Sequence, residues 1–165
     1  MIDKGHRQLG ADNKKRTLAI IVASILVIGG VLGFFWWAHK AFSPFPPEIV
    51  SRATFPLYFP EQTPVGLMLD THSFSSTSQV VTYNYIYEGS KRLIVSIQPL
   101  KGVDTDQFNA TNKFTTHIGT AYVVDLDSRT TAAVVGQKSL VLINAPQKIA
   151  VDTMNQFINN LRQVN

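Results

Sequence analysis

The stretch QVVTYNYIYEGSKRLIVSIQ, residues 79–98, decides the fold of the large C-terminal part of this chain. Two runs of β-branched and aromatic residues, Gln79 to Tyr87 and Arg92 to Gln98, each alternate between two faces, as the residues of a strand do. Glu88-Gly89-Ser90-Lys91 separates the runs and has the composition of a turn. The stretch therefore predicts an antiparallel β-hairpin.

Further short runs on both sides of the hairpin predict more strands and a short helical turn. The turn is expected over Asp104 to Asn109, after Pro99 ends the preceding strand, with Asp104 or Thr105 as its cap. The additional strands are expected at Gly66 to Asp70, Thr120 to Leu126, Thr130 to Val135 and Ser139 to Asn144. The last three are closely spaced, so they predict an antiparallel meander.

An amphipathic helix is predicted to close the chain. Pro146 has a backbone angle that suits the first turn of a helix. Apolar residues then recur at helical spacing at Ala150, Met154, Phe157, Ile158, Leu161 and Val164. The expected fold class is α+β: a small antiparallel sheet over residues 65–165, with this C-terminal helix packed on one face.

A proline-rich segment precedes the predicted domain. Six of the eight prolines fall between Ala41 and Pro64. Proline fixes φ and removes a hydrogen-bond donor, so the pattern predicts a semi-rigid stalk over residues 39–64 without a regular helix. Its apolar second half, Phe55 to Phe59, is expected to pack onto the domain as an edge segment.

An uncharged apolar run, LAIIVASILVIGGVLGFFWWA at residues 18–38, predicts a transmembrane helix. At about 1.5 Å per residue it reaches roughly 30 Å, the thickness of the hydrocarbon core of a bilayer. The run is longer than the core of a cleaved signal peptide, which favours an uncleaved anchor. Leu18, Ile28, Trp36 and Trp37 are expected to contact lipid, and Gly29 and Gly33 form a small-residue pair that would allow two spans to approach closely.

The distribution of charge predicts the orientation of that span. Residues 1–17 hold five Lys or Arg against two Asp, whereas residues 39–165 hold ten against nine. Cationic residues next to a span are retained in the cytoplasm, so we expect a cytoplasmic N-terminus and an extracytoplasmic C-terminal domain. The basic excess belongs to the membrane-flanking tail and calls for no nucleic-acid partner. Without cysteine, the domain has neither disulfides nor thiolate metal ligands.

Few residues suggest chemistry at a site. His72 and His117 are 45 residues apart and have no metal-ligand spacing, and the paired carboxylates at Asp104 and Asp106, and at Asp125 and Asp127, lack the further ligands of a calcium loop. These residues are expected in solvated loops and turns. No catalytic, cofactor-binding or metal site is predicted. Asn109-Ala110-Thr111 is a glycosylation sequon, which matters only in an organism that glycosylates such triplets.

Three tyrosines on one face of the predicted hairpin leave two interpretations open. Tyr83, Tyr85 and Tyr87 could stack against a sugar ring or a partner peptide, because each has an apolar body and a polar tip. They could equally form the core beneath the C-terminal helix, next to the apolar face of the second hairpin strand.

Several segments resemble a known type of domain. FPLYFPEQTPVGL, the hairpin ending in IVSIQ, the IGTAY strand and the closing helix are similar to the extracytoplasmic domain at the C-terminal end of some bacterial anti-sigma-factor-like and sporulation-associated membrane proteins. The resemblance covers about residues 55–163 and implies an antiparallel sheet with a packed C-terminal helix. The cytoplasmic tail of about 17 residues is too short to fold into a sigma-binding domain.

The sequence thus predicts a single-pass protein of the cell membrane whose small domain binds or senses at the envelope without catalysis. Its expected partners are the lipid bilayer and another envelope protein or a second copy of the span. The alternative is a structural subunit of an envelope, secretion, pilus or division assembly, with the span as a helix contact. A membrane-tethered hydrolase is a third, weaker interpretation.

Overall fold

The computed structural model describes residues 28–30 and 43–164. Residues 28–30 are helical and exposed. No helix among the described residues is long and apolar enough to cross a membrane. The predictions for the basic tail and for most of the span, including Leu18, Gly33, Trp36 and Trp37, lie outside the described residues.

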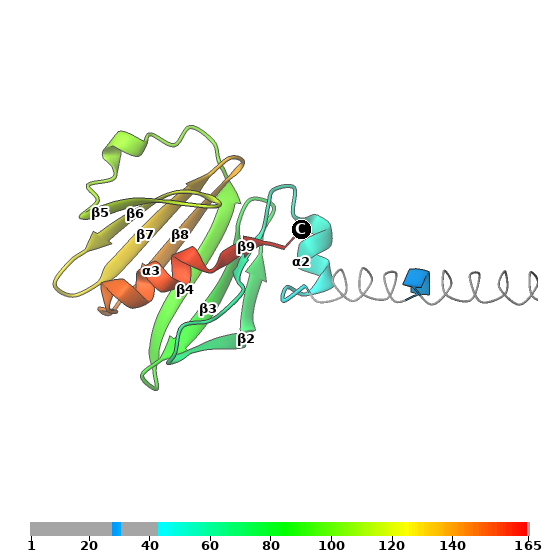
Figure 1. Ribbon diagram of the computed structural model, residues 1–165, viewed down its shortest axis with the longest axis horizontal. Helices are drawn as coiled ribbons and strands as arrows, with labels where there is room; N and C mark the ends of the chain where they lie inside the picture. The colour runs from blue at the N-terminus through cyan, green and yellow to red at the C-terminus, as the bar shows by residue number, and fades with distance from the viewer. Residues whose placement is uncertain (1–27, 31–42, 165) are drawn as a thin grey trace, which may run out of the picture. The chain divides into compact units, whose positions relative to one another are not determined.

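A compact unit begins at Ser43 and contains a mostly antiparallel β fold (Figure 1). Its elements are α2 (Pro47–Arg52), β1 (Tyr58–Pro60), β2 (Leu67–Ser76), β3 (Val81–Tyr87), β4 (Lys91–Pro99), η1 (Thr105–Gln107), β5 (Asn112–Thr116), β6 (Gly119–Asp125), β7 (Thr130–Gly136), β8 (Ser139–Ala145), α3 (Val151–Asn159) and β9 (Leu161–Gln163). Seven strands form one sheet in the order β2-β3-β4-β8-β7-β6-β5, and β1 pairs with β9 in a separate two-stranded sheet.

The predicted hairpin and meander are both confirmed. In β3 and β4, Tyr83 lies opposite Val95 and Tyr85 opposite Leu93. The chain then leaves β4 and crosses to the far edge of the sheet, so that β8 returns beside β4. The helical turn within that crossover is also present, because the Asp104 side chain accepts a hydrogen bond from the Asp106 backbone N–H. Strand β5 was missed, since its only large apolar residue is Phe114.

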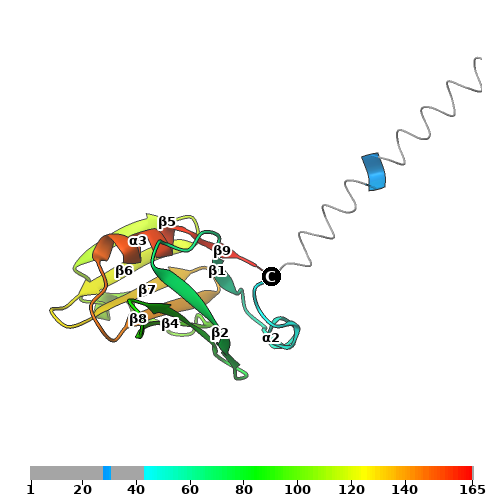
Figure 2. The same ribbon diagram turned by 90° about the horizontal axis from the view of Figure 1, so that it is seen from below.

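Helix α3 and the strand that follows it lie over one face of the sheet (Figures 1 and 2). The helix buries Met154, Phe157 and Ile158 completely. The Phe157 ring meets the Tyr85 ring edge to face, with 5.2 Å between their centroids. The prediction that the C-terminal helix packs on the sheet through this apolar stripe is therefore confirmed.

The predicted helix is too long at both ends. It does not begin at Pro146, because side chains of the sheet bind the backbone carbonyls that would start it: the Tyr87 hydroxyl donates to Gln147 O at 2.7 Å and the Thr130 hydroxyl to Ile149 O at 2.9 Å. It ends at Asn159, and the last apolar residues continue as β9 in an antiparallel pair with β1.

The segment predicted as a stalk belongs to the folded unit from Ser43 onward. Helix α2 forms despite the prolines, because Pro47 is its first residue, where a missing N–H costs nothing. Phe45 is 2% exposed and packs edge to face on Phe59 and Tyr83. The expected packing of Phe55 to Phe59 is confirmed, since Phe55, Leu57 and Tyr58 are buried. The domain boundary predicted at residue 65 is therefore too late.

Candidate functional site

The three tyrosines of β3 lie in the core. Tyr83 and Tyr85 are 0% exposed and Tyr87 is 6% exposed. The Tyr83 hydroxyl donates to the Tyr58 backbone O at 2.9 Å, which ties β3 to β1. The interpretation of these tyrosines as a ligand or partner surface is therefore wrong. The other interpretation, that they form the core beneath α3, agrees with the structure. The reason is that their face of the sheet is the one that α3 and the β1-β9 pair cover.

Burial of these tyrosines makes the fold sensitive to alkaline pH. Burial raises the pKa of Tyr83 and of Tyr85, because a phenolate loses its hydration inside the core. In the unfolded chain a tyrosine loses its proton near pH 10. The stabilising contribution is therefore complete below that pH and declines as the pH rises, by about 1.4 kcal/mol per pH unit for each tyrosine.

We expect urea unfolding midpoints to fall steeply between pH 9.5 and 11. Tyr85→Phe should reduce that slope, because it removes one of the two fully buried hydroxyl groups whose ionisation the folded state opposes. Equal slopes for the variant and the parent protein would contradict this account.

The histidines and paired carboxylates do not form one site. His72 lies in β2 at one edge of the sheet, and His117 lies in the turn before β6 near the other edge. Asp104 caps η1 and also accepts from the Gln107 amide at 3.0 Å. Across residues 28–30 and 43–164, no group of three or more His, Asp or Glu could hold a metal ion.

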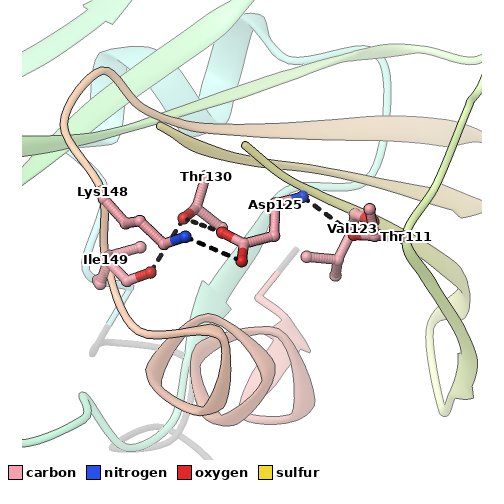
Figure 3. A network of polar contacts seen from close by, with 6 residues as sticks. All are labelled: Thr111, Val123, Asp125, Thr130, Lys148 and Ile149. Atoms are coloured by element: carbon pink, nitrogen blue, oxygen red, sulfur yellow. Dashed lines mark hydrogen bonds and ion pairs between the residues drawn. The ribbon is translucent and has the colours of Figure 1, made fainter. Parts of the chain in front are cut away.

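Asp125 differs from the solvated turn residue that its sequence context predicts. It ends β6 and is partly buried, and Figure 3 shows that Lys148 and Thr130 both reach its carboxylate. The Lys148 Nζ lies 3.2 Å from it, and the Thr130 hydroxyl 3.1 Å. Since Thr130 also contacts the Ile149 backbone O, this network fixes the segment that leads into α3 to the end of the sheet.

The structure does bring His117 into a hollow of about 380 Å³ at one end of the sheet. Its lining comes from three parts of the chain that are distant in sequence: the segment around β1, two tight turns of the large sheet, and β9. The lining residues are Pro56, Tyr58, His117, Ile118, Gln137, Lys138 and Gln163.

Two neighbouring two-residue turns form one side of this hollow, which we call the His117 hollow. His117 and Ile118 connect β5 to β6, and Gln137 and Lys138 connect β7 to β8. The turns lie side by side because Gly119 pairs with Gly136 across β6 and β7. Hydrogen bonds of the Thr116 hydroxyl with the backbone of Ile118 and Gly119 hold the first turn in shape.

The β1-β9 pair forms the opposite side. Tyr58 lies opposite Gln163 in that pair. The Ser139 hydroxyl at the start of β8 donates to Pro56 O at 3.0 Å, so the segment is fixed to the large sheet. The Tyr58 hydroxyl lies beside Gly136 at the end of β7, because a Cβ atom built on Gly136 would be 3.4 Å from it.

Arg162 connects His117 to the β1 side through charge and hydrogen bonds. Its Nη1 lies 2.7 Å from His117 Nε2 and 3.0 Å from Nδ1, so the unprotonated ring nitrogen can accept from it. The Asn159 and Leu161 carbonyl oxygens lie 2.9 and 3.0 Å from the same nitrogen and share its two N–H groups with His117, and Nε lies 3.2 Å from a carboxylate oxygen of Glu61. The guanidinium group is thus held at one place beside the hollow.

A second hollow of about 250 Å³ lies on the face of the sheet opposite α3. It is mostly apolar, and its wall includes Phe108, whose ring lies 5.2 Å from that of Tyr122. Leu142 and Ala133 contribute to its floor. It contains no charged side chain, so it offers shape but little chemical selectivity.

Sequence reasoning found only part of the His117 hollow. It placed His117 in a loop and left residues 136–138 as the connection between two predicted strands, but it proposed none of Tyr58, Lys138 and Arg162 as a site residue. The signal that could have linked the two turns is the pair of glycines at 119 and 136, which flank them and permit close approach of the strands.

No family model, curated protein or solved structure matches this chain.

Proposed function

We propose that the protein is a single-pass membrane protein whose small extracytoplasmic domain binds a ligand or partner at the cell envelope without catalysing a reaction. Residues 18–38 support the membrane anchor, because they form an uncharged apolar run of bilayer length. The basic tail at residues 1–17 supports a cytoplasmic N-terminus. The folded unit then starts at Ser43, directly after the anchor.

The observation that carries the binding function is the His117 hollow. Its volume of about 380 Å³ falls within the range of small-molecule sites. It combines an apolar wall at Pro56 and Ile118 with polar side chains from two turns. Each side is fixed by hydrogen bonds to the main sheet, and a preformed site loses less entropy when it binds.

The chemistry of the lining favours binding over catalysis. Among the lining residues, His117 is the best candidate for a general base. Its ring contacts the Arg162 guanidinium group, which competes with a substrate proton for the free ring nitrogen. Gln137, Lys138 and Tyr58 provide hydrogen-bond donors and a positive charge. Groups of this kind can bind and orient a ligand through hydrogen bonds and charge.

Topology reporters test the membrane part of the proposal. Alkaline phosphatase fused after Asn165 should be active, because the enzyme folds only outside the cytoplasm. A fluorescent protein that does not fold after export should give no fluorescence when it is fused at the same place. A matched variant with Lys14→Gln, Lys15→Gln and Arg16→Gln should lower phosphatase activity, because the orienting charges are reduced. A fluorescent fusion in the cytosol, or a soluble trimmed product, would overturn the proposal.

A further inference from the structure

The positive charge around the His117 hollow is unbalanced. None of the seven lining residues is acidic, and Lys138 is exposed and has no ion-pair partner within residues 28–30 and 43–164. The Arg162 guanidinium group adds a second positive charge beside His117. Glu61, the carboxylate paired with Arg162, compensates only one of the two.

Neutral donors accompany this charge. Burial raises the pKa of Tyr58, so its hydroxyl stays protonated and able to donate at physiological pH. Gln137 contributes a side-chain amide from the same turn as Lys138. A positive charge beside neutral donors is the arrangement that binds an oxyanion well, because hydrogen bonds to an ionised acceptor are stronger than neutral ones.

We propose that the His117 hollow binds an anionic oxygen group, a carboxylate or a phosphate, with Lys138 as its charged contact and Gln137 and Tyr58 as neutral donors. Arg162 acts from the border of the hollow as a fixed charge, because backbone carbonyls and Glu61 hold its Nη1 and Nε in place. This inference rests on the proposed function and names the ligand class of the same site. The group can belong to a soluble molecule or to a lipid headgroup.

Lysine reactivity measures occupancy of the hollow directly. The full chain is reconstituted in phosphatidylcholine nanodiscs and acetylated briefly, with or without inorganic phosphate, at constant ionic strength set with chloride. Mass spectrometry then gives the acetylation rate of Lys138. At a phosphate concentration twice the dissociation constant, the rate should fall about threefold, because only about a third of the sites remain free.

Lys101 is the internal control, since it is an exposed lysine in the loop after β4 and does not line the hollow. Its rate should not change. Calorimetric titration with phosphate should show saturable binding for the parent protein and for Lys101→Gln, and none for Lys138→Gln. Protection of Lys138 in nanodiscs that contain phosphatidylglycerol, without added phosphate, would identify a lipid headgroup as the source of the anion.

Two results would overturn the inference. Equal slowing at Lys138 and Lys101 would indicate general screening, and an unchanged Lys138 rate under both phosphate and anionic lipid would show that the hollow binds no anion. Either result leaves the membrane topology untouched, because the reporter fusions test that part separately.

Discussion

Gly119→Ala should destabilise the domain by about 3 kcal/mol or more, since backbone strain of this kind alone costs on the order of 1–3 kcal/mol. Gly119 has a φ of +151°, and a Cβ atom there would lie 2.0 Å from the Val135 backbone O and 2.9 Å from the Gly136 Cα. These atoms belong to the paired strand and cannot rotate away. Strand β6 would have to separate from β7 next to the His117 hollow.

Gly102→Ala is the matched control for this substitution. Gly102 also has a positive φ, at +59°, but a Cβ atom there would meet nothing within 4 Å. That variant should lose only about 1 kcal/mol, the cost of a left-handed backbone without a clash. Urea unfolding of the full chain, followed by pulse proteolysis, would measure both. Equal losses for the two variants would show that the close approach at Gly119 does not matter.

Phe157→Asp should unfold the domain while membrane insertion continues. Phe157 is 0% exposed and packs on Tyr85 at the centre of the core. Loss of a buried phenylalanine costs about 3–5 kcal/mol, and a buried unpaired carboxylate adds several more. The sum reaches the total stability of a typical domain, about 5–15 kcal/mol.

Gln156→Asp provides the control one residue earlier in α3, where the side chain is exposed. It introduces the same charge and should change stability by no more than about 0.5 kcal/mol. Membrane fractionation should recover both variants with the bilayer, and limited proteolysis should degrade only the Phe157→Asp domain. A protease-resistant Phe157→Asp domain would mean that α3 does not hold the core together.

The parts of the fold that could be predicted from sequence are those with a regular apolar period. The alternation in residues 79–98 was enough for the hairpin, and the apolar stripe at Met154, Phe157 and Ile158 was enough for the centre of the last helix. The ends of that helix could not be predicted, because tertiary contacts set them: Tyr87 and Thr130 hold the carbonyls of Gln147 and Ile149. No local sequence pattern predicts those two hydrogen bonds.

The candidate site was harder to predict for a related reason. Its two turns are adjacent only because β6 pairs with β7, and its opposite wall exists only because the last strand pairs with β1. Residue 58 and residue 163 are separated by most of the domain, yet they face each other. By contrast, the alternate spacing of the three tyrosines of β3 suggested a binding face. That spacing reflects their burial on one face of the strand.

The position of Phe45 limits how far the domain can travel. Its ring is buried in the aromatic core. The proposed membrane span ends at Ala38, seven residues before Phe45. The seven residue-to-residue steps from Ala38 to Phe45 span no more than about 25 Å even when the chain is fully extended. Under the membrane topology proposed above, the burial of Phe45 would therefore keep the domain close to the lipid surface, and a ligand of the His117 hollow would be bound there.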